Sequence, residues 1–194
     1  MSLSRRRFLE ASALGAGALA LPRVGWATEV LRQTTPLRVL VLGGTGFIGP
    51  HMVQHALDRG HTVTLFNRGR SNTHLFPQLE KLVGDRNGQL DTLRGRTWDA
   101  VIDNSGYFPS HVRQSAELLQ GSVDHYLFTS TVDAYRDYRV AGIDESYPLG
   151  RRPEGAPENP SEYYGPLKAE CEDIIVETYP NNGTRVRPGW IAGP

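Results

Sequence analysis

The sequence is organised around one stretch, Val41-Leu42-Gly43-Gly44-Thr45-Gly46-Phe47-Ile48-Gly49-Pro50-His51. It follows an apolar run at 37–42 and leads into apolar side chains at helical spacing. Glycines at every third position let the backbone turn tightly and approach a ligand where a Cβ would collide. The N–H groups and the positive dipole end of the following helix face the same place, which suits a pyrophosphate. The stretch therefore predicts a dinucleotide site formed by Gly43, Gly46, Phe47, Ile48 and Gly49.

Strand-like and helix-like runs alternate along the rest of the chain. We expect strands at 37–42, 61–66, 81–83, 98–103, 125–129 and 184–187, and helices at 47–59, 110–119 and 165–179. This alternation predicts an α/β fold with a doubly wound, Rossmann-type parallel sheet, whose ligand lies beyond the carboxyl ends of the strands. The long connection at 137–160 is rich in Gly, Pro and charge, so we expect it to be functional or disordered.

The N-terminus has the pattern of an export signal over residues 1–27. A basic segment with Arg5 and Arg6 precedes a short apolar run at 11–21, and Ala27 closes a small-x-small cleavage pattern. The segment resembles a twin-arginine (Tat) signal, and this predicts a periplasmic or exported protein that folds in the cytoplasm. The alternatives are a membrane anchor or a basic N-terminus that arose by chance. Residues 36–194 would then form one nucleotide-binding domain, free of the membrane after processing and truncated at its C-terminus.

The composition argues against several classes of function. The chain has 21 basic and 21 acidic residues, and this balance gives no support to general nucleic-acid binding. Its single cysteine, Cys171, excludes an internal disulfide, and we expect it in the core, as we do Trp98. His51 and His55 are one helical turn apart, but they lack the Glu of a His-Glu-x-x-His motif and an evident third ligand. We therefore expect no metal site.

The end of the second predicted strand bears on the choice of dinucleotide. An acidic residue about twenty positions after the Gly-rich turn would hold the ribose hydroxyls of NAD. This chain has Asn67-Arg68-Gly69-Arg70 there instead. Asn67 can still bind a ribose, while Arg68 or Arg70 can pair with a 2′-phosphate. We therefore favour NADP over NAD; the alternative is that both arginines are solvated loop charges.

A second motif, Tyr164-Gly165-Pro166-Leu167-Lys168, places a phenol and an ammonium one helical turn apart. Pro166 suits the first turn of a helix, which puts Tyr164 at the helix entrance. A free phenol, with a pKa of about 10, is a poor base at neutral pH, but a nearby ammonium and an oxidised nicotinamide favour the phenolate. The motif predicts an acid/base pair, the alternative being an ordinary surface pair. Thr129-Ser130-Thr131 offers a hydroxyl to a substrate oxygen in the same crevice.

Together the motifs resemble the extended short-chain dehydrogenases/reductases, also called NAD-dependent epimerases/dehydratases. The resemblance rests on the Gly-rich turn, Gly84-Asp85, Asp103 to Gly106, Thr129 to Thr131, Tyr164 to Lys168 and Arg187 to Pro194. It implies an enzyme in which Tyr164 is the acid/base, Lys168 orients the cofactor ribose and lowers the pKa of that tyrosine, and Thr131 polarises the substrate oxygen. It also implies that the adenine meets Asp85 and that the middle of the cofactor meets Asn104, Ser105 and Gly106.

The resemblance further implies an NAD(P)-dependent oxidoreductase, epimerase or dehydratase that acts on a sugar, a nucleotide sugar or a similar small molecule with a hydroxyl group. Members of the family generally continue into a substrate lobe, which is largely missing from this chain. The residues of the Gly-rich turn and of 66–70 look most like those of a subgroup that includes chloroplast stem-loop RNA-binding proteins. The alternative function is therefore a non-catalytic nucleotide-binding module that binds RNA or a protein partner. The neutral charge and the export signal argue against RNA, and the oligomeric state, including a homo-oligomer, stays open.

Overall fold

The computed structural model describes residues 35–192, so the predicted export signal lies outside the described residues. The strands are β1 (Arg38–Leu42), β2 (Thr62–Asn67), β3 (Glu80–Val83), β4 (Trp98–Asp103), β5 (Val123–Thr129) and β6 (Gly183–Val186). The helices are α3 (Gly49–Asp58), α4 (Pro109–Leu119) and α5 (Pro160–Thr178), with short 3-10 turns η1 (Asp91–Leu93) and η2 (Val132–Ala134). Among these described elements, no helix combines the length and the apolar character needed to cross a bilayer.

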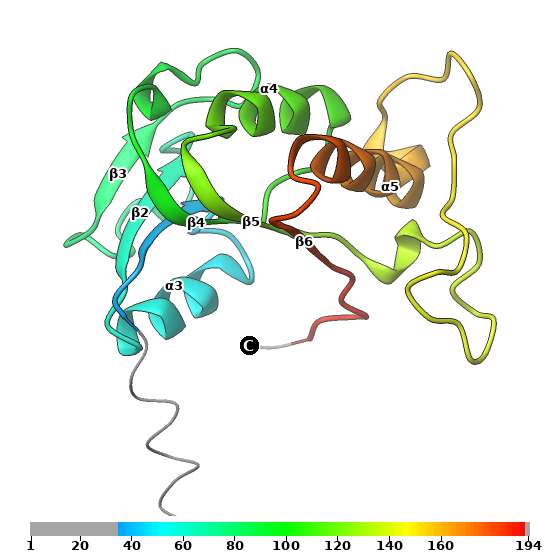
Figure 1. The fold of residues 1–194 in the computed structure, drawn as a ribbon, viewed down its shortest axis with the longest axis horizontal. Helices are drawn as coiled ribbons and strands as arrows, with labels where there is room; N and C mark the ends of the chain where they lie inside the picture. The colour runs from blue at the N-terminus through cyan, green and yellow to red at the C-terminus, as the bar shows by residue number, and fades with distance from the viewer. Residues whose placement is uncertain (1–34, 193–194) are drawn as a thin grey trace, which may run out of the picture. The chain divides into compact units, whose positions relative to one another are not determined.

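The six strands form one parallel sheet in the order β3-β2-β1-β4-β5-β6. Helix α3 covers one face, and α4 and α5 cover the other (Figure 1). The predicted doubly wound fold is therefore confirmed. The strand order reverses between β1 and β4, and in such sheets this reversal opens a ligand crevice beyond the carboxyl ends of the strands.

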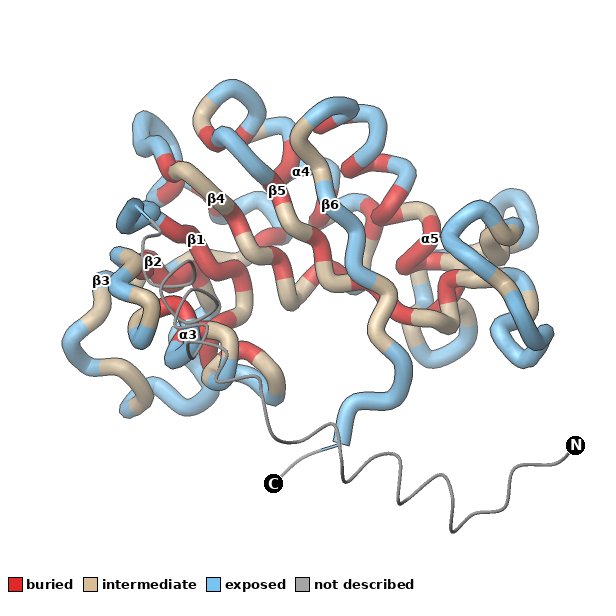
Figure 2. The backbone as a smooth tube through the Cα atoms, turned by 60° about the horizontal axis from the view of Figure 1, so that its bottom comes forward, coloured by how far each residue is buried: buried red, intermediate tan, exposed pale blue. Residues whose placement is uncertain are grey.

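Alternate residues of β1 enter two separate cores, one on each face of the sheet. Leu40 and Leu42 pack with apolar residues of α4 and α5, while Val39 and Val41 pack with residues of α3. The central strands are therefore buried on both faces, as parallel sheets usually are, while the edge strand β6 is largely exposed (Figure 2). Cys171 and Trp98 lie in the larger core, as predicted.

Helix α5 differs from its predicted start at 165. It begins at Pro160, where the side chain of Asn159 caps the backbone. The backbone at Tyr163 is not helical (φ −121°, ψ 34°), so α5 consists of two segments across a kink. The kink has a cause: Pro166 has no N–H to donate to the preceding turn, and its ring crowds the carbonyl there. Tyr164 therefore stands at the entrance of the second segment rather than at the start of the whole helix.

The connection between η2 and α5 carries no helix or strand, but several contacts fix it to the domain. Tyr135 and Leu149 form an antiparallel bridge. Near its end, Glu158 accepts hydrogen bonds from the backbone N–H of Ser110 at 3.2 Å and from the Ser110 hydroxyl at 2.7 Å. A carboxylate at the N-terminus of a helix is favourable, so this contact anchors the connection to α4.

Candidate functional site

A pocket of about 540 Å³ lies at the carboxyl ends of the strands, where the strand order reverses. It is lined by Gly43, Thr45 to Ile48, Phe66 to Ser71, Gly84 to Arg86, Asn104, Ser105, Tyr107, Phe108, His111, Thr129 to Thr131, Tyr164, Lys168, Pro188, Gly189 and Ile191. Motifs that are up to about 150 positions apart in the sequence thus meet around one cavity. Among the described residues, no group of three or more His, Cys, Asp or Glu side chains is placed to hold a metal ion.

Two of the predicted cofactor residues, Gly49 and Gly106, do not line the pocket. A Cβ at Gly49 would collide with the backbone oxygen of Gly43, and one at Gly106 would collide with the ring of Phe128. Both glycines are needed because other parts of the protein approach them closely. They shape the wall of the pocket and do not face its interior.

The glycines of the turn are required for different reasons. Gly43 has φ +87°, in the region that favours glycine, and a Cβ there would lie 2.8 Å from the Cβ of Ser105. A Cβ at Gly46 would meet no described atom within 4 Å, so its surroundings are open to the pocket. Phe47 has φ 26° and its side chain is 67% exposed, which explains why α3 begins at Gly49 and not at 47 as predicted.

The N-terminus of α3 has the character of an anion site. Its N-cap residue, Ile48, makes no side-chain capping bond, and its first turn holds no acidic residue. The first N–H groups of a helix have no partner within the helix, and the helix dipole places positive potential there. Because Ile48 and the residues before it line the pocket, this end of α3 can receive a phosphate.

The loop after β2 is held in a defined shape. The side-chain oxygen of Asn67 accepts the N–H of residue 69 at 2.8 Å, and the side-chain nitrogen of Asn72 donates to the carbonyl of Thr45 at 2.9 Å. The second bond ties the loop directly to the Gly-rich turn. Arg68 and Arg70 line the pocket, are exposed, and have no ion-pair partner among residues 35–192. Their guanidinium groups are therefore available to an anion.

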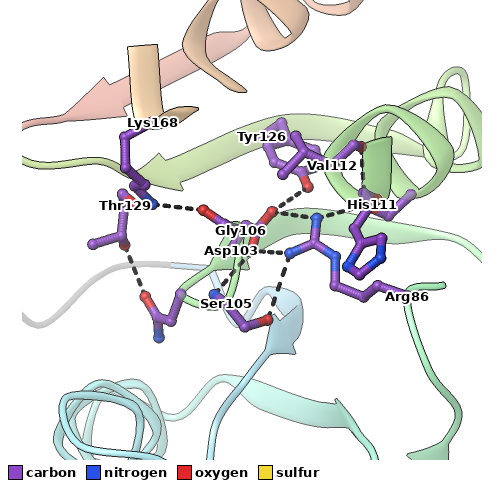
Figure 3. A network of polar contacts seen from close by, with 11 residues as sticks. Arg86, Asp103, Ser105, Gly106, His111, Val112, Tyr126, Thr129 and Lys168 are labelled. Carbon is purple, nitrogen blue, oxygen red and sulfur yellow. Dashed lines mark hydrogen bonds and ion pairs between the residues drawn. The ribbon is translucent and has the colours of Figure 1, made fainter. Parts of the chain in front are cut away.

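A buried charge network, which sequence reasoning missed, lies behind the pocket (Figure 3). Arg86 contacts Asp103 with both terminal nitrogens, at 2.6 and 2.8 Å, and it also donates to Ser115 at 2.6 Å. Asp103 is fully buried and accepts further bonds from the hydroxyl of Tyr126 at 2.8 Å and the N–H of Ser105 at 3.1 Å. The network fixes the loop after β4. The only signal in the sequence was the charged residue Asp103 at the end of the apolar strand β4.

Two buried donors near this network have no partner among the described residues, namely Nε of Arg86 and the side-chain nitrogen of Asn104. The oxygen of the Asn104 amide accepts from the hydroxyl of Thr129 at 2.8 Å, which fixes how the amide is turned. A buried donor without a partner lowers the stability of the folded protein by about 1–3 kcal/mol. Both residues line the pocket, so these donors fit the acceptor atoms of a bound dinucleotide.

The three hydroxyl residues at the end of β5 have different partners. Thr129 donates to Asn104, and Ser130 donates to the buried carboxylate of Glu172. Thr131 instead accepts the N–H of Asp133 at 3.2 Å, and its hydroxyl also hydrogen-bonds with Tyr164. Of the three hydroxyl residues, Thr131 is therefore the one that contacts Tyr164, and its role toward a substrate oxygen stays a prediction.

Tyr164 and Lys168 both line the pocket, and the pKa of each is shifted. Burial raises the pKa of Tyr164, as do the neighbouring Tyr107 and Asp133, and only a hydrogen bond with Thr131 lowers it. The ammonium of Lys168 donates to the backbone carbonyls of Gly106 and Thr129. Burial lowers the pKa of Lys168 itself to about 8.

A second buried pair, also missed in the sequence, joins α5 to the segment after β6. Arg187 donates to both oxygens of Glu172, at 2.9 Å from Nε and 2.6 Å from Nη2, and its guanidinium lies 4.6 Å from the ring centroid of Tyr135. The N–H of Val132 bonds the carbonyl of Pro188 at 3.0 Å. These contacts fix the walls of the pocket on either side of Thr131.

Comparison with known proteins agrees with this geometry. Residues 39–194 match the NAD dependent epimerase/dehydratase family. The chain is 27% identical over 173 residues to the chloroplast stem-loop binding protein of 41 kDa b from Arabidopsis thaliana, covering 81% of this chain and 43% of that protein. It is 26% identical over 168 residues to UDP-glucose 4-epimerase of Neisseria meningitidis, covering 72% and 47%.

Among solved structures, the enzyme WbmG of Bordetella bronchiseptica in complex with NAD and UDP has the same fold, with a TM-score of 0.61 at 15% identity over 79% of this chain and 53% of that one. The chain thus spans about half the length of the relatives it matches. The family match extends over most of the sequence and includes each motif that meets at the pocket. The chain belongs to the NAD dependent epimerase/dehydratase family.

Proposed function

We propose that the pocket binds NADP in preference to NAD, and that the chain serves an oxidoreductase, epimerase or dehydratase that acts on a nucleotide sugar. One observation carries the proposal: a single cavity is lined by the Gly-rich turn, by the free arginines Arg68 and Arg70, and by Tyr164 and Lys168. Phosphate-binding and acid/base groups are thus gathered where one dinucleotide and its substrate would meet.

The cofactor would lie along the carboxyl ends of the strands. The turn at 43–48 and the N-terminus of α3 would hold the pyrophosphate. Asn67 would bind the adenosine ribose, Arg68 and Arg70 would pair with its 2′-phosphate, and Asp85 would meet the adenine. Asn104, Ser105 and the unpaired donor of Arg86 would meet the middle of the cofactor.

Tyr164 would move the proton of the reaction at its phenolic oxygen. A bound nicotinamide supplies the hydride acceptor and donor. Since burial raises the pKa of Tyr164, the positive charge of an oxidised nicotinamide would have to lower it before the tyrosine accepts a proton. The hydroxyl of Thr131, which hydrogen-bonds with Tyr164, would donate to the same substrate oxygen and hold it beside Tyr164.

The nature of the substrate is supported by the relatives. One similar protein is named UDP-glucose 4-epimerase, and the structure of WbmG contains NAD and UDP. The segment after β6 lines the same pocket as Tyr164, through Pro188, Gly189 and Ile191. We therefore place the sugar of a nucleotide sugar near this segment. Whether it is epimerised, dehydrated or reduced depends on contacts beyond the described residues.

Substitution of Tyr164 by Phe tests the proposal. Tyr164→Phe should lower turnover of UDP-glucose by at least about a hundredfold, because a positioned acid/base contributes that much or more. Binding of NADPH, followed by its fluorescence, should be retained. Tyr163→Phe is a matched control, because that neighbouring tyrosine does not line the pocket. Normal turnover by Tyr164→Phe would show that the proposed mechanism is wrong.

A non-catalytic role in RNA binding is the alternative, and the name of the Arabidopsis thaliana relative supports it. The balanced charge of the chain argues against it. Titration of the chain with a mixed RNA pool at several salt concentrations separates the two functions, because phosphate contacts give binding that weakens steeply with salt. Tight, salt-dependent binding of RNA that NADPH does not displace would favour the alternative.

We also infer that residues 1–27 direct export through the Tat route, after the domain has folded around its cofactor in the cytoplasm. The pair Arg5 and Arg6 before a short apolar run supports this. A double substitution, Arg5→Lys with Arg6→Lys, should retain the protein in the cytoplasm of a bacterial host. Export of the double variant at the wild-type level would contradict the inference.

A further inference from the structure

Lys168 lies in an enclosure of carbonyl groups and aromatic rings. Its ammonium donates to the carbonyl of Gly106 at 2.8 Å and to that of Thr129 at 2.6 Å, and it lies 4.2 Å from the ring centroid of Phe128. The residue is only 3% exposed. Since an ammonium has three N–H donors, one remains after the two carbonyls are served.

Tyr107 forms the pocket side of this enclosure. Its ring centroid lies 5.5 Å from the Lys168 ammonium and 6.3 Å from the ring centroid of Tyr164. Phe128 is fully buried, whereas Tyr107 is 46% exposed and lines the pocket. The Tyr107 hydroxyl has no hydrogen-bond partner among the described side chains and backbone groups. Lys168 also lines the pocket, so the Tyr107 ring covers only part of the side of Lys168 that faces it.

We propose that Tyr107 is a positioning residue of this site, whose ring lies between the Lys168 ammonium and the Tyr164 ring and keeps water from that ammonium. The enclosure itself is formed by the folded chain. Only its role in catalysis rests on the proposed function. Neither the exclusion of water nor the attraction of a cation to a ring face requires the hydroxyl. Phenylalanine should therefore serve at position 107 as well as tyrosine.

The protonation of Lys168 depends on this enclosure. Burial is the largest influence and lowers its pKa to about 8, from an ordinary value of 10.5. Of the groups that face it, Asp103, Cys171 and Glu172 raise the pKa and Arg86 lowers it. These four come from β4, α5 and the segment after β3, and none of them is changed by a substitution at 107. A smaller side chain there would admit water and let the pKa return towards 10.5.

The chain has only two lysines, Lys81 and Lys168, so the lysine protonation can be measured directly. The full chain is produced with lysine isotopically labelled at Cε, and its two NMR signals are followed across the neutral and alkaline range. Lys81→Arg assigns the signals. The titration is repeated for Tyr107→Phe, Tyr107→Leu and Tyr107→Ala.

We expect the pKa of Lys168 to stay near 8 in Tyr107→Phe and to rise in the order Leu, then Ala, as the ring is replaced by smaller groups. The Lys81 signal serves as the reference within each sample, and circular dichroism of each variant shows that the fold is intact. If Ala prevents folding, the comparison of Phe with Leu still decides. An unchanged Lys168 pKa in Leu and Ala, or a rise in Phe equal to that in Ala, would overturn the proposal. Failure of the wild type to bind NADPH would refute the proposed function while leaving this titration valid.

Discussion

The two sides of the pocket are built in different ways. On the side of β1, β2 and α3 the backbone turns at glycines, and the charged residues Arg68 and Arg70 are exposed. On the side of β4, β5 and α5 the charged residues Asp103 and Glu172 are fully buried and paired. The first side is therefore set by backbone shape. The second is set by buried charged side chains. Removing one partner of such a pair leaves the other charge buried without a counter-ion.

The largest effect should come from the buried pair. Asp103→Ala leaves the guanidinium of Arg86 buried without its counter-ion, which typically costs about 3–5 kcal/mol. The free energy of unfolding from urea titration measures the loss. Asp99→Ala is the matched control, because Asp99 pairs with Arg38 at the surface, and we expect little change there. Equal losses of unfolding free energy in the two variants would mean that the buried pair contributes no more to stability than the surface pair.

The pH dependence of stability tests the second side again. Because the pKa of Lys168 is about 8 in the folded protein and 10.5 ordinarily, the unfolded chain binds more protons between these values. The contribution of Lys168 to stability is therefore unfavourable below pH 8 and improves as the pH rises towards 10.5. Relative to Lys168→Met, the wild type should gain on the order of 3 kcal/mol across this window. Parallel stability curves for the two proteins would contradict the burial of a charged Lys168.

On the first side, two glycines separate the needs of the fold from those of the ligand. Gly43→Ala should cost about 1–2 kcal/mol, because a side chain is strained at φ +87°. Gly46→Ala should change the free energy of unfolding very little, since no atom lies within 4 Å of the added Cβ. It should nevertheless weaken NADP binding, measured by calorimetry, because that Cβ would occupy the space proposed for the pyrophosphate. Unchanged binding in Gly46→Ala would show that the ligand does not approach this turn.

The smallest effect should come from the exposed arginines. Arg70→Ala should weaken NADPH binding by about fivefold, on the order of 1 kcal/mol, because an exposed ion pair contributes no more than that. Binding of NADH should be unchanged, since it carries no 2′-phosphate. Arg94→Ala, at an exposed arginine that does not line the pocket, provides the control. A similar loss for NADH would mean that Arg70 does not read the 2′-phosphate.

The two sides also differed in how well they could be predicted from the sequence. The β1–α3 turn was predictable because its strand, glycines and helix lie within one short stretch, and local chemistry decides it. The pairing of Arg86 with Asp103 depends on which strands become neighbours, and the pairing of Glu172 with Arg187 depends on where β6 docks. Neither pair has a local pattern that would reveal it.

The start of α5 was mispredicted for a similar reason. Pro166 suits a first turn, but Pro160 and its cap at Asn159 suit one equally well, and the chain uses both across the kink at Tyr163. Gly49 was assigned to the cofactor from the Gly-rich turn and Gly106 from the family resemblance, and neither says what an added Cβ would strike. In the structure it would strike the protein itself.

The most direct test of the central claim is a titration of the full wild-type chain with oxidised NADP, followed by calorimetry and by the two lysine signals in NMR. If the pocket holds the dinucleotide, binding should be saturable, and it should move the signal of Lys168, which lines the pocket, and leave that of Lys81 unchanged. No saturable binding of either NADP or NAD, or binding that leaves Lys168 unaffected, would contradict the claim.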